Sequence, residues 1–433
     1  ECSRPQDRCE RHEPAGGIAM PAVTAGVGGT SGGREAQVAV LATRSMFGGR
    51  NVGRSPSRSR NGMNGLDGMN GDKPRIGLVL GGGGLKGFAH LGVLEVLVGA
   101  GITPVLMAGS SIGALIASAH MLGTPLQLMR EGALGLRRKD LFRVNASGFA
   151  RGLLRSPSFY YAEPLEALIA NVIPDRRFDQ LPKPLLVNTV DLERGMQVMW
   201  GAPGFRHASI RDAVYASCAL PGFFPPGVVG GRVCIDGGTV DNMPVSAAAE
   251  GLDLVIAVDV GNSEVENATD VSQKGIASIF MRSATLMMRT LQRAPLQQWN
   301  GPPLVLIRPH VSRFNWFDFT AIPTMLKAGV DAATDVLDAI PQALRAGKGI
   351  FPRQQVRVHV SRDQCTGCGQ CTAMAPHAMV RGVDGKAVPR QAQFDWSPID
   401  SDFSVHCPTG AIGLERRVIS ARRPNEESSE RVA

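Results

Sequence analysis

A serine occupies the centre of a G-x-S-x-G pattern made by Gly109, Ser111 and Gly113. The pattern follows the apolar run ITPVLMAG and opens the apolar run SIGALIASAHMLG, which predict a strand and a helix. A serine in such a tight strand-to-helix turn presents its hydroxyl at the edge of a sheet and at a helix N-terminus. Ser111 is therefore a candidate nucleophile, whereas Ser110 occupies the variable place of the pattern.

Four glycines at 81–84 lie between the predicted strand RIGLVL and the predicted helix LKGFAHLGVLEVLVGAG. Glycines allow close backbone approach, so successive N–H groups can point at one anionic atom. Gly82, Gly84 and Gly87 also fit the dinucleotide pattern G-x-G-x-x-G. That pattern requires an acidic residue at the end of the next strand, and VLMAGSSIG contains none. The sequence therefore favours an anion-binding loop over a nucleotide site.

An aspartate precedes two glycines in the segment VCIDGGTVDNMP. Asp236 follows an apolar strand, and Gly237 and Gly238 leave room around its carboxylate at the bend. An ordinary turn aspartate would give the same local pattern. The motif by itself leaves both interpretations open.

Together with ASCALPGFFPP at 216–226, these three motifs resemble the patatin-like phospholipase family over about residues 75–345, and the form GGGGLKGFAHLGVL resembles its bacterial members. The resemblance implies an α/β fold, a three-layer α/β/α hydrolase with a mostly parallel sheet, acting on a lipid or other acyl ester without a cofactor. It implies a Ser–Asp dyad, with Ser111 as nucleophile and Asp236 as base. It also implies an oxyanion hole of backbone N–H groups at Gly82, Gly83 and Gly84. The glycines expected to support these motifs are Gly87, Gly109, Gly113, Gly237 and Gly238.

Other functions remain open on the same residues. His310 follows a strand and lies after Asp236 in the chain, which is the Ser–Asp–His order of α/β-hydrolases. The motifs would equally serve an acyltransferase that passes the acyl group to an acceptor other than water. A non-catalytic lipid-binding module coupled to an electron-transfer ferredoxin is a further alternative.

Near the C-terminus, the segment CTGCGQCTAMAP carries Cys365, Cys368 and Cys371 at iron–sulfur spacing. The fourth position of a bacterial-type run is Ala375, but Cys407 follows later and directly precedes a proline. In two-cluster ferredoxins the last cysteine of each run ligates the other cluster. Residues 354–417 therefore resemble a small α+β ferredoxin-like domain with one [4Fe-4S] cluster on these four cysteines. A zinc site and an empty module remain alternatives.

Ester hydrolysis moves no electrons, so the cluster is not expected to take part in the chemistry at Ser111. We expect it to sense redox state or oxygen, or to dock a redox partner, and so to control the hydrolase. The remaining cysteines are scattered, which does not predict a disulfide framework. Cys218 and Cys234 lie in apolar segments and are expected to be buried thiols. These features favour a cytoplasmic protein.

The composition divides the chain into four parts. Residues 1–72 are rich in Gly, Ser and Arg and are expected to be disordered, with no evident signal peptide. The acyl hydrolase domain is expected at 74–350, the ferredoxin-like domain at 354–417 and a charged tail at 418–433. Residues 102–122 contain no charged residue, but Pro104, the break at Gly109, Ser110 and Ser111, and Gly113 divide them into a strand and a helix instead of one membrane span.

The net charge of +8 with only 5% aromatic residues argues for a lipid surface and against nucleic acid as a partner. Basic and apolar residues alternate in a stretch expected either to dock at the inner membrane face or to cap the site. These residues are Arg137, Arg138, Lys139, Phe142, Arg143, Phe149, Arg151, Leu153 and Arg155. Helices are also expected at 276–291, in contact with the core, and at 324–346.

Overall fold

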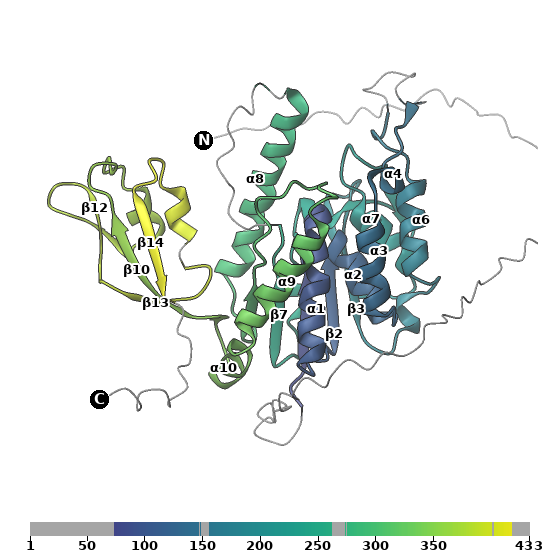
Figure 1. The fold of residues 1–433 in the computed structure, drawn as a ribbon, viewed down its shortest axis with the longest axis horizontal. Helices are drawn as coiled ribbons and strands as arrows, with labels where there is room; N and C mark the ends of the chain where they lie inside the picture. Colours follow the sequence, from purple (N-terminus) through teal and green to yellow (C-terminus); the bar gives the residue numbers. More distant parts are fainter. Residues whose placement is uncertain are drawn as a thin grey trace, which may run out of the picture. The chain divides into compact units, whose positions relative to one another are not determined.

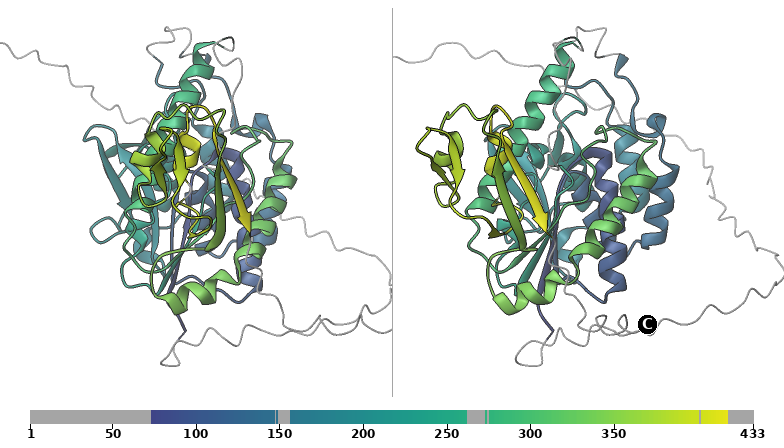
Figure 2. Two further views of the ribbon diagram at one scale, coloured as in Figure 1. Left: turned by 90° about the vertical axis from the view of Figure 1, so that its left-hand side faces the viewer. Right: turned by 60° about the vertical axis from the view of Figure 1, so that its left-hand side comes forward.

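The computed structural model describes residues 73–146, 148, 156–261, 273, 275–400 and 402–417. The expectations for the arm at 1–72, for the tail at 418–433 and for Phe149, Arg151, Leu153 and Arg155 lie outside these residues. The ribbon is shown from three directions in Figures 1 and 2.

A nine-stranded sheet forms the centre of the larger domain (Figure 1). All of its pairings among β3, β2, β1, β7, β8 and β9 are parallel, whereas β4, β5 and β6 add antiparallel pairings at the β3 side. The mostly parallel sheet expected from the alternating strands and helices is thus confirmed. Its strands, in sheet order, are β5 (Gly227–Val229), β6 (Arg232–Asp236), β3 (Leu185–Asp191), β2 (Leu106–Ser110), β1 (Ile76–Leu80), β7 (Leu254–Val258), β8 (Leu304–Ile307) and β9 (Ile350–Phe351), with β4 (Met196–Trp200) paired to β3.

Helices connect these strands. Their order along the chain is η1 (Gly84–Phe88), α1 (Ala89–Gly99), α2 (Ile112–Met121), α3 (Leu126–Gly135), α4 (Arg138–Leu141), α6 (Glu163–Val172), α7 (Ile210–Cys218), α8 (Ile276–Gln297), α9 (Ile322–Val336) and α10 (Ala339–Ala346). Short 3-10 turns follow β6 at Gly237–Thr239 and precede β7 at Ser246–Ala248.

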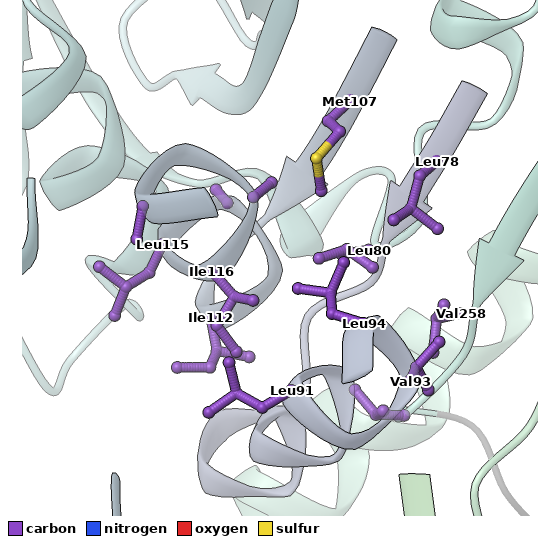
Figure 3. Packing of buried hydrophobic residues seen from close by; sticks show 14 of the residues in the cluster. Leu78, Leu80, Leu91, Val93, Leu94, Met107, Ile112, Leu115, Ile116 and Val258 are labelled. Atoms are coloured by element: carbon purple, nitrogen blue, oxygen red, sulfur yellow. The ribbon is translucent and has the colours of Figure 1, made fainter. Parts of the chain in front are cut away.

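Each face of the sheet has its own core because successive side chains of a strand point to opposite faces. On one face, Leu78 and Leu80 pack with α1, α2, α7 and α9 in a large cluster (Figure 3). On the other face, Val79 packs with a smaller cluster that includes Met243 and Leu296. The sheet therefore lies between two layers, as a three-layer α/β/α fold requires.

Two expected helices differ from the structure. The single helix expected at 324–346 is two helices, α9 and α10, and Pro341 lies in the first turn of α10, where its missing N–H costs nothing. The helix expected from Leu85 begins instead as the 3-10 turn η1 and becomes α-helical only at Ala89.

Residues 102–122 contain the whole of β2 and the whole of α2, as the proline and glycines in this stretch predicted. Among the described residues, no helix combines the length and the apolar character needed to cross a bilayer.

The C-terminal module has a small core of its own. An antiparallel sheet of β13 (Phe394–Trp396), β10 (Gln354–Val360) and β14 (Ile412–Arg417) packs with the hairpin of β11 (Met379–Arg381) and β12 (Ala387–Pro389) and with α11 (Gln370–Met374). Ala375, at the position where a bacterial-type run has its fourth cysteine, is 2% exposed and belongs to this core.

Candidate active site

Ser111 lies at the turn between β2 and α2, at the point where the parallel strands end. Its backbone has φ 54° and ψ −129°, and it is the one non-glycine residue with positive φ in the described part of the chain. A side chain in this region is strained, and such strain concentrates at functional sites. Because α2 begins at the next residue, Ser111 also lies at the positive end of a helix dipole.

Glycines on both sides of Ser111 permit this turn. A Cβ on Gly109 would lie 2.6 Å from the carbonyl oxygen of Gly113, and a Cβ on Gly113 would collide with the carbonyl oxygen of Leu80. A Cβ on Gly87 would collide with Ile112, so Gly87 lets η1 approach the start of α2. The expected supporting role of these three glycines has a steric basis in the structure.

A second serine, Ser217, stabilises this turn by a hydrogen bond to its backbone. The N–H of Ser111 donates to the hydroxyl of Ser217 at 2.8 Å, and this hydroxyl donates to the carbonyl of Asn188 at 2.6 Å. Ser217 is fully buried in α7. It lies within the segment ASCALPGFFPP, but nothing in that segment singles out its hydroxyl.

Asp236 ends β6 and is 3% exposed. Its Oδ1 accepts a hydrogen bond from the N–H of Gly238 at 2.8 Å, and its carboxylate lines the same pocket as Ser111. Burial raises the pKa of Asp236 to about 6, although the Gly238 N–H and the nearby side chain of Ser111 act in the opposite direction. The structure thus brings the hydroxyl and the carboxylate together, and it leaves the carboxylate a stronger base than an exposed aspartate.

The glycine loop lies directly beside Ser111. A Cβ on Gly82 would be 3.1 Å from the Cβ of Ser111, and a Cβ on Gly84, where φ is +59°, would be 2.6 Å from the carbonyl oxygen of Trp316. No side chain could be accommodated at either glycine. The loop can therefore bring backbone N–H groups close to a substrate carbonyl.

One of the three expected oxyanion donors is already engaged. The N–H of Gly82 donates to the carbonyl oxygen of Asn242 at 3.1 Å, so including Gly82 in the oxyanion hole was wrong for this conformation. The amides of Gly83 and Gly84 remain the predicted donors.

Asn242 has a role that the sequence did not indicate. Its side-chain amide donates to the carbonyl oxygen of Gly82 at 2.9 Å, and the residue is 3% exposed. A Cβ on Gly238 would lie 2.7 Å from the Oδ1 of Asn242. Asn242 therefore contacts both the glycine loop and the turn after Asp236. Asn242 belongs to the segment VCIDGGTVDNMP, but nothing in that segment indicates a role for its amide.

His90 supports the same loop. The ring is fully buried on α1, and its Nε2 donates to the carbonyl oxygen of Gly81 at 2.8 Å. Burial lowers the pKa of His90 to about 4, so the ring is neutral at pH 7. A neutral imidazole carries one N–H, and the contact with a carbonyl assigns it to Nε2.

A mostly apolar pocket that opens to solvent is lined by Ser111 and Asp236. Gly84 lies in its wall, and the rest of the lining is dominated by leucine and aromatic side chains. Such a lining suits an acyl chain. The lining side chains include Leu85, Phe88, Leu115, Leu141, Leu165, Phe224, Trp316 and Phe317.

Other candidate residues lie elsewhere or differ from expectation. No histidine is among the residues that line this pocket, and His310 is exposed. Cys234 is buried, as expected. Cys218, by contrast, is only partly buried and forms part of the pocket wall. Burial and the nearby Asp236 raise the pKa of its thiol well above the usual value.

The four C-terminal cysteines line one pocket of the small module. Cys371 is buried, Cys368 is exposed, and the other two are intermediate. Within the described ranges, no three Cys, His, Asp or Glu side chains are placed to hold one metal ion. The thiols surround a space and do not converge on a single point.

Comparison with known proteins finds a family that is similar to part of the larger domain. Residues 78–249 match the model of the Patatin family, described as patatin-like phospholipase. This part of the chain is similar to patatin-like phospholipases. The matched range contains Ser111, Asp236 and Asn242, whereas the C-terminal module lies beyond it.

Individual relatives agree with this family. An NTE-family protein of Mycobacterium tuberculosis is 35% identical over 199 residues, which are 46% of this chain and 52% of that protein. Lysophospholipase NTE1 of Kluyveromyces lactis is 27% identical over 294 residues, 62% of this chain and 19% of that protein. The chain thus spans about half the length of the first relative. The crystal structure of VipD from Legionella pneumophila is 19% identical, with a TM-score of 0.39 over 68% of this chain and 72% of that one.

Proposed function

We propose that this chain hydrolyses acyl esters of lipids through a dyad of Ser111 and Asp236. The observation that carries the proposal is that a strained serine and a buried carboxylate lie close together at the wall of one apolar pocket. The patatin-like phospholipase match supports the substrate class, and so does a relative named as a lysophospholipase.

In the first step, the Oγ of Ser111 attacks the ester carbonyl carbon and its proton passes to Asp236. A carboxyl group with a pKa of about 6 accepts a proton near neutral pH better than an ordinary aspartate does. Negative charge develops on the carbonyl oxygen, and the amides of Gly83 and Gly84 together with the N-terminus of α2 stabilise it. One such donor is typically worth about 3 kcal/mol.

The acyl-enzyme then forms as the alcohol leaves with the proton from Asp236. A water molecule, deprotonated by Asp236, attacks the acyl carbonyl in the second step and releases the fatty acid and Ser111. The leucine and aromatic lining holds the acyl chain in both steps.

Labelling with a fluorophosphonate probe tests the nucleophile, and a screen of phospholipid and lysophospholipid classes tests the substrate. Wild type should be labelled and should release fatty acid, whereas Ser111→Ala should do neither. A wild-type protein that reacts with no probe and cleaves no lipid would support a non-catalytic lipid-binding module. Transfer of the acyl group to an added alcohol in preference to water would support an acyltransferase.

We further propose that Cys365, Cys368, Cys371 and Cys407 hold one [4Fe-4S] cluster. When bound, such a cluster takes one thiolate on each of four irons, so its ligands surround a space. The shared pocket of the four thiols supports this arrangement. Gly367 and Gly369, both with positive φ, let the backbone fold around the same pocket.

Iron and sulfide analysis of the full chain tests the cluster. Reconstituted wild type should bind four irons with a brown absorbance, and Cys368→Ser should lose most of it. Because Cys368 is exposed, the change should not unfold the module. Cys9→Ser is the matched control, since Cys9 lies outside the spaced set. Binding of a single zinc with no iron would contradict the proposal.

A regulatory role for the cluster is part of the same proposal, because ester hydrolysis itself needs no electrons. Reduced, oxidised and cluster-free protein should differ in the rate of ester hydrolysis or in binding to membranes. Equal values in all three forms would remove the regulatory role and leave the hydrolase proposal intact.

A further inference from the structure

Helix α8 presents an apolar face to solvent. Along its exposed side lie Ile276, Ile279, Phe280, Leu286, Met287 and Leu291, with Ile276 85% and Phe280 58% exposed. These positions recur at intervals of three and four residues, so they form one stripe along the helix. Among the α8 side chains that the structure describes, none of the exposed ones is charged. The core contact expected for the apolar residues of this helix was wrong.

The protein-facing side of the helix is more polar than its exposed side. Gln292 and Arg293 are 3% and 9% exposed, and Arg282 is half-buried. Among the α8 side chains that the structure describes, the one that belongs to a hydrophobic core cluster is Leu296 in the last turn. A surface helix of a soluble protein normally has the opposite arrangement, with its apolar stripe inward. An exposed apolar stripe of this kind is typical of a surface that binds a protein partner or a membrane.

The charge of the segment that contains α8 indicates what covers it. Between Val271 and Phe317 the sequence contains six Lys or Arg residues and no Asp or Glu. Among those that the structure describes, Arg282 and Arg313 reach solvent, whereas Arg293 is 9% exposed and Arg308 pairs with Asp259. An apolar helix face in a basic segment is typical of helices that lie in the interface of anionic bilayers. Phe280 and the leucines would enter the acyl boundary, while Arg282 and Arg313 would meet the phosphate groups.

The helix also borders the candidate active site. A Cβ on Gly238 would lie 3.1 Å from the Cε of Met288, and Gly238 is two residues from Asp236. Gln292 approaches the side-chain amide of Asn242 with its Oε1 at 3.5 Å. The inner side of α8 thus contacts the turn after Asp236, while the apolar side chains described on its outer side are exposed. Figures 1 and 2 show its first turns rising clear of the neighbouring helices.

We propose that α8 is the element by which this chain docks on an anionic lipid surface, placing the pocket of Ser111 next to its substrate. The catalytic benefit of docking rests on the proposed lipid hydrolase. The docking itself depends only on the exposed apolar stripe and on the positive charge of the segment that contains α8.

Co-sedimentation with vesicles tests docking apart from catalysis. Vesicles of phosphatidylglycerol with phosphatidylcholine are compared with vesicles of phosphatidylcholine alone. The variant is Phe280→Glu with Met287→Glu. The matched control is Val98→Glu with Leu128→Glu, two helical residues that are also exposed, on α1 and α3. Hydrolysis of nitrophenyl butyrate, a soluble ester, reports on the dyad without a surface.

Wild type should bind the anionic vesicles at least tenfold better than the neutral ones. The α8 variant should lose at least tenfold in anionic vesicle affinity while the control keeps it, and both should hydrolyse the soluble ester like wild type. Equal binding by the α8 variant and wild type overturns the proposal. A wild-type protein that binds no vesicles also overturns it. One such case is a wild type that buries the α8 face in a dimer, which the α8 variant would dissociate.

The two proposals fail in different ways. Vesicle binding that depends on α8 in a protein that hydrolyses no ester would reject the hydrolase and keep the docking surface. Hydrolysis of the soluble ester with no vesicle binding would do the reverse.

Discussion

Asn242 and Gly82 exchange two hydrogen bonds: the side-chain amide of Asn242 donates to the carbonyl of Gly82 at 2.9 Å, and the N–H of Gly82 donates to the carbonyl of Asn242 at 3.1 Å. The two residues are 160 positions apart. Their pairing ties the glycine loop to the segment that follows the dyad aspartate. It also engages the amide of Gly82, so that Gly83 and Gly84 are left as the predicted donors.

Replacement of Asn242 should therefore slow catalysis without weakening binding. Asn242→Asp keeps the shape of the side chain but removes the amide donor, and a displaced loop can cost up to about 100-fold in rate. We expect kcat on a soluble ester to fall about 10- to 100-fold with KM little changed. Asn300→Asp, at an exposed position, is the control. A drop confined to thermal stability would show that Asn242 has only a structural role.

Substitution of the two adjacent serines, Ser110 and Ser111, tests which of them is the nucleophile. Ser111→Ala should abolish ester hydrolysis and probe labelling. Ser110→Ala should retain both, because the buried hydroxyl of Ser110 has no hydrogen-bond partner within the described part of the chain. Kinetic assays and intact-mass measurement after probe treatment distinguish the two. Labelling that survives in Ser111→Ala would reject the assignment of the nucleophile.

The rate should depend on pH through the protonation state of Asp236. Only the ionised carboxylate can accept the proton of Ser111, and its pKa is raised to about 6. We expect kcat/KM to rise tenfold per pH unit below about 6 and to level off above it. A pH series on a neutral soluble ester measures this. A midpoint near the ordinary aspartate value of 3.8 would contradict the role of burial.

The same shift predicts that the dyad costs stability. The pKa of Asp236 is higher in the folded protein than its usual 3.8, so stability is lost as pH rises from 3.8 to about 6 and stays constant above that. Asp236→Asn removes this cost and should raise the free energy of unfolding at pH 8 by roughly 3 kcal/mol. Urea titrations should show the gain shrinking toward pH 4. Asp335→Asn, at an exposed position on α9, should show no such trend.

The parts of the site that the sequence predicts are those set by local chain geometry. Gly109, Ser111 and Gly113 lie within five consecutive residues, so the strained turn can be predicted from their order. Asp236 before its two glycines is equally local. Ser217 and Asn242 act across the fold, through bonds to residues 106 and 160 positions away. A single sequence contains no signal that joins them to their partners.

The orientation of helices was the other source of error. The apolar residues of α8 repeat at helical spacing, but periodicity does not tell which face is turned inward. The assumption that apolar residues face the core failed because Gln292 and Arg293 occupy that side. The break between α9 and α10, in contrast, had a signal in Pro341, which favours the first turn of a new helix.

The unusual environment of Cys218 makes its thiol chemically distinct from the exposed thiol of Cys368. Alkylating reagents attack the thiolate, and the raised pKa of Cys218 leaves almost none of it at neutral pH. Cys368, at the far end of the chain, is open to solvent. A maleimide dye applied at pH 7 to cluster-free protein would thus react with Cys368 in preference to Cys218, so the lipid pocket would stay unlabelled.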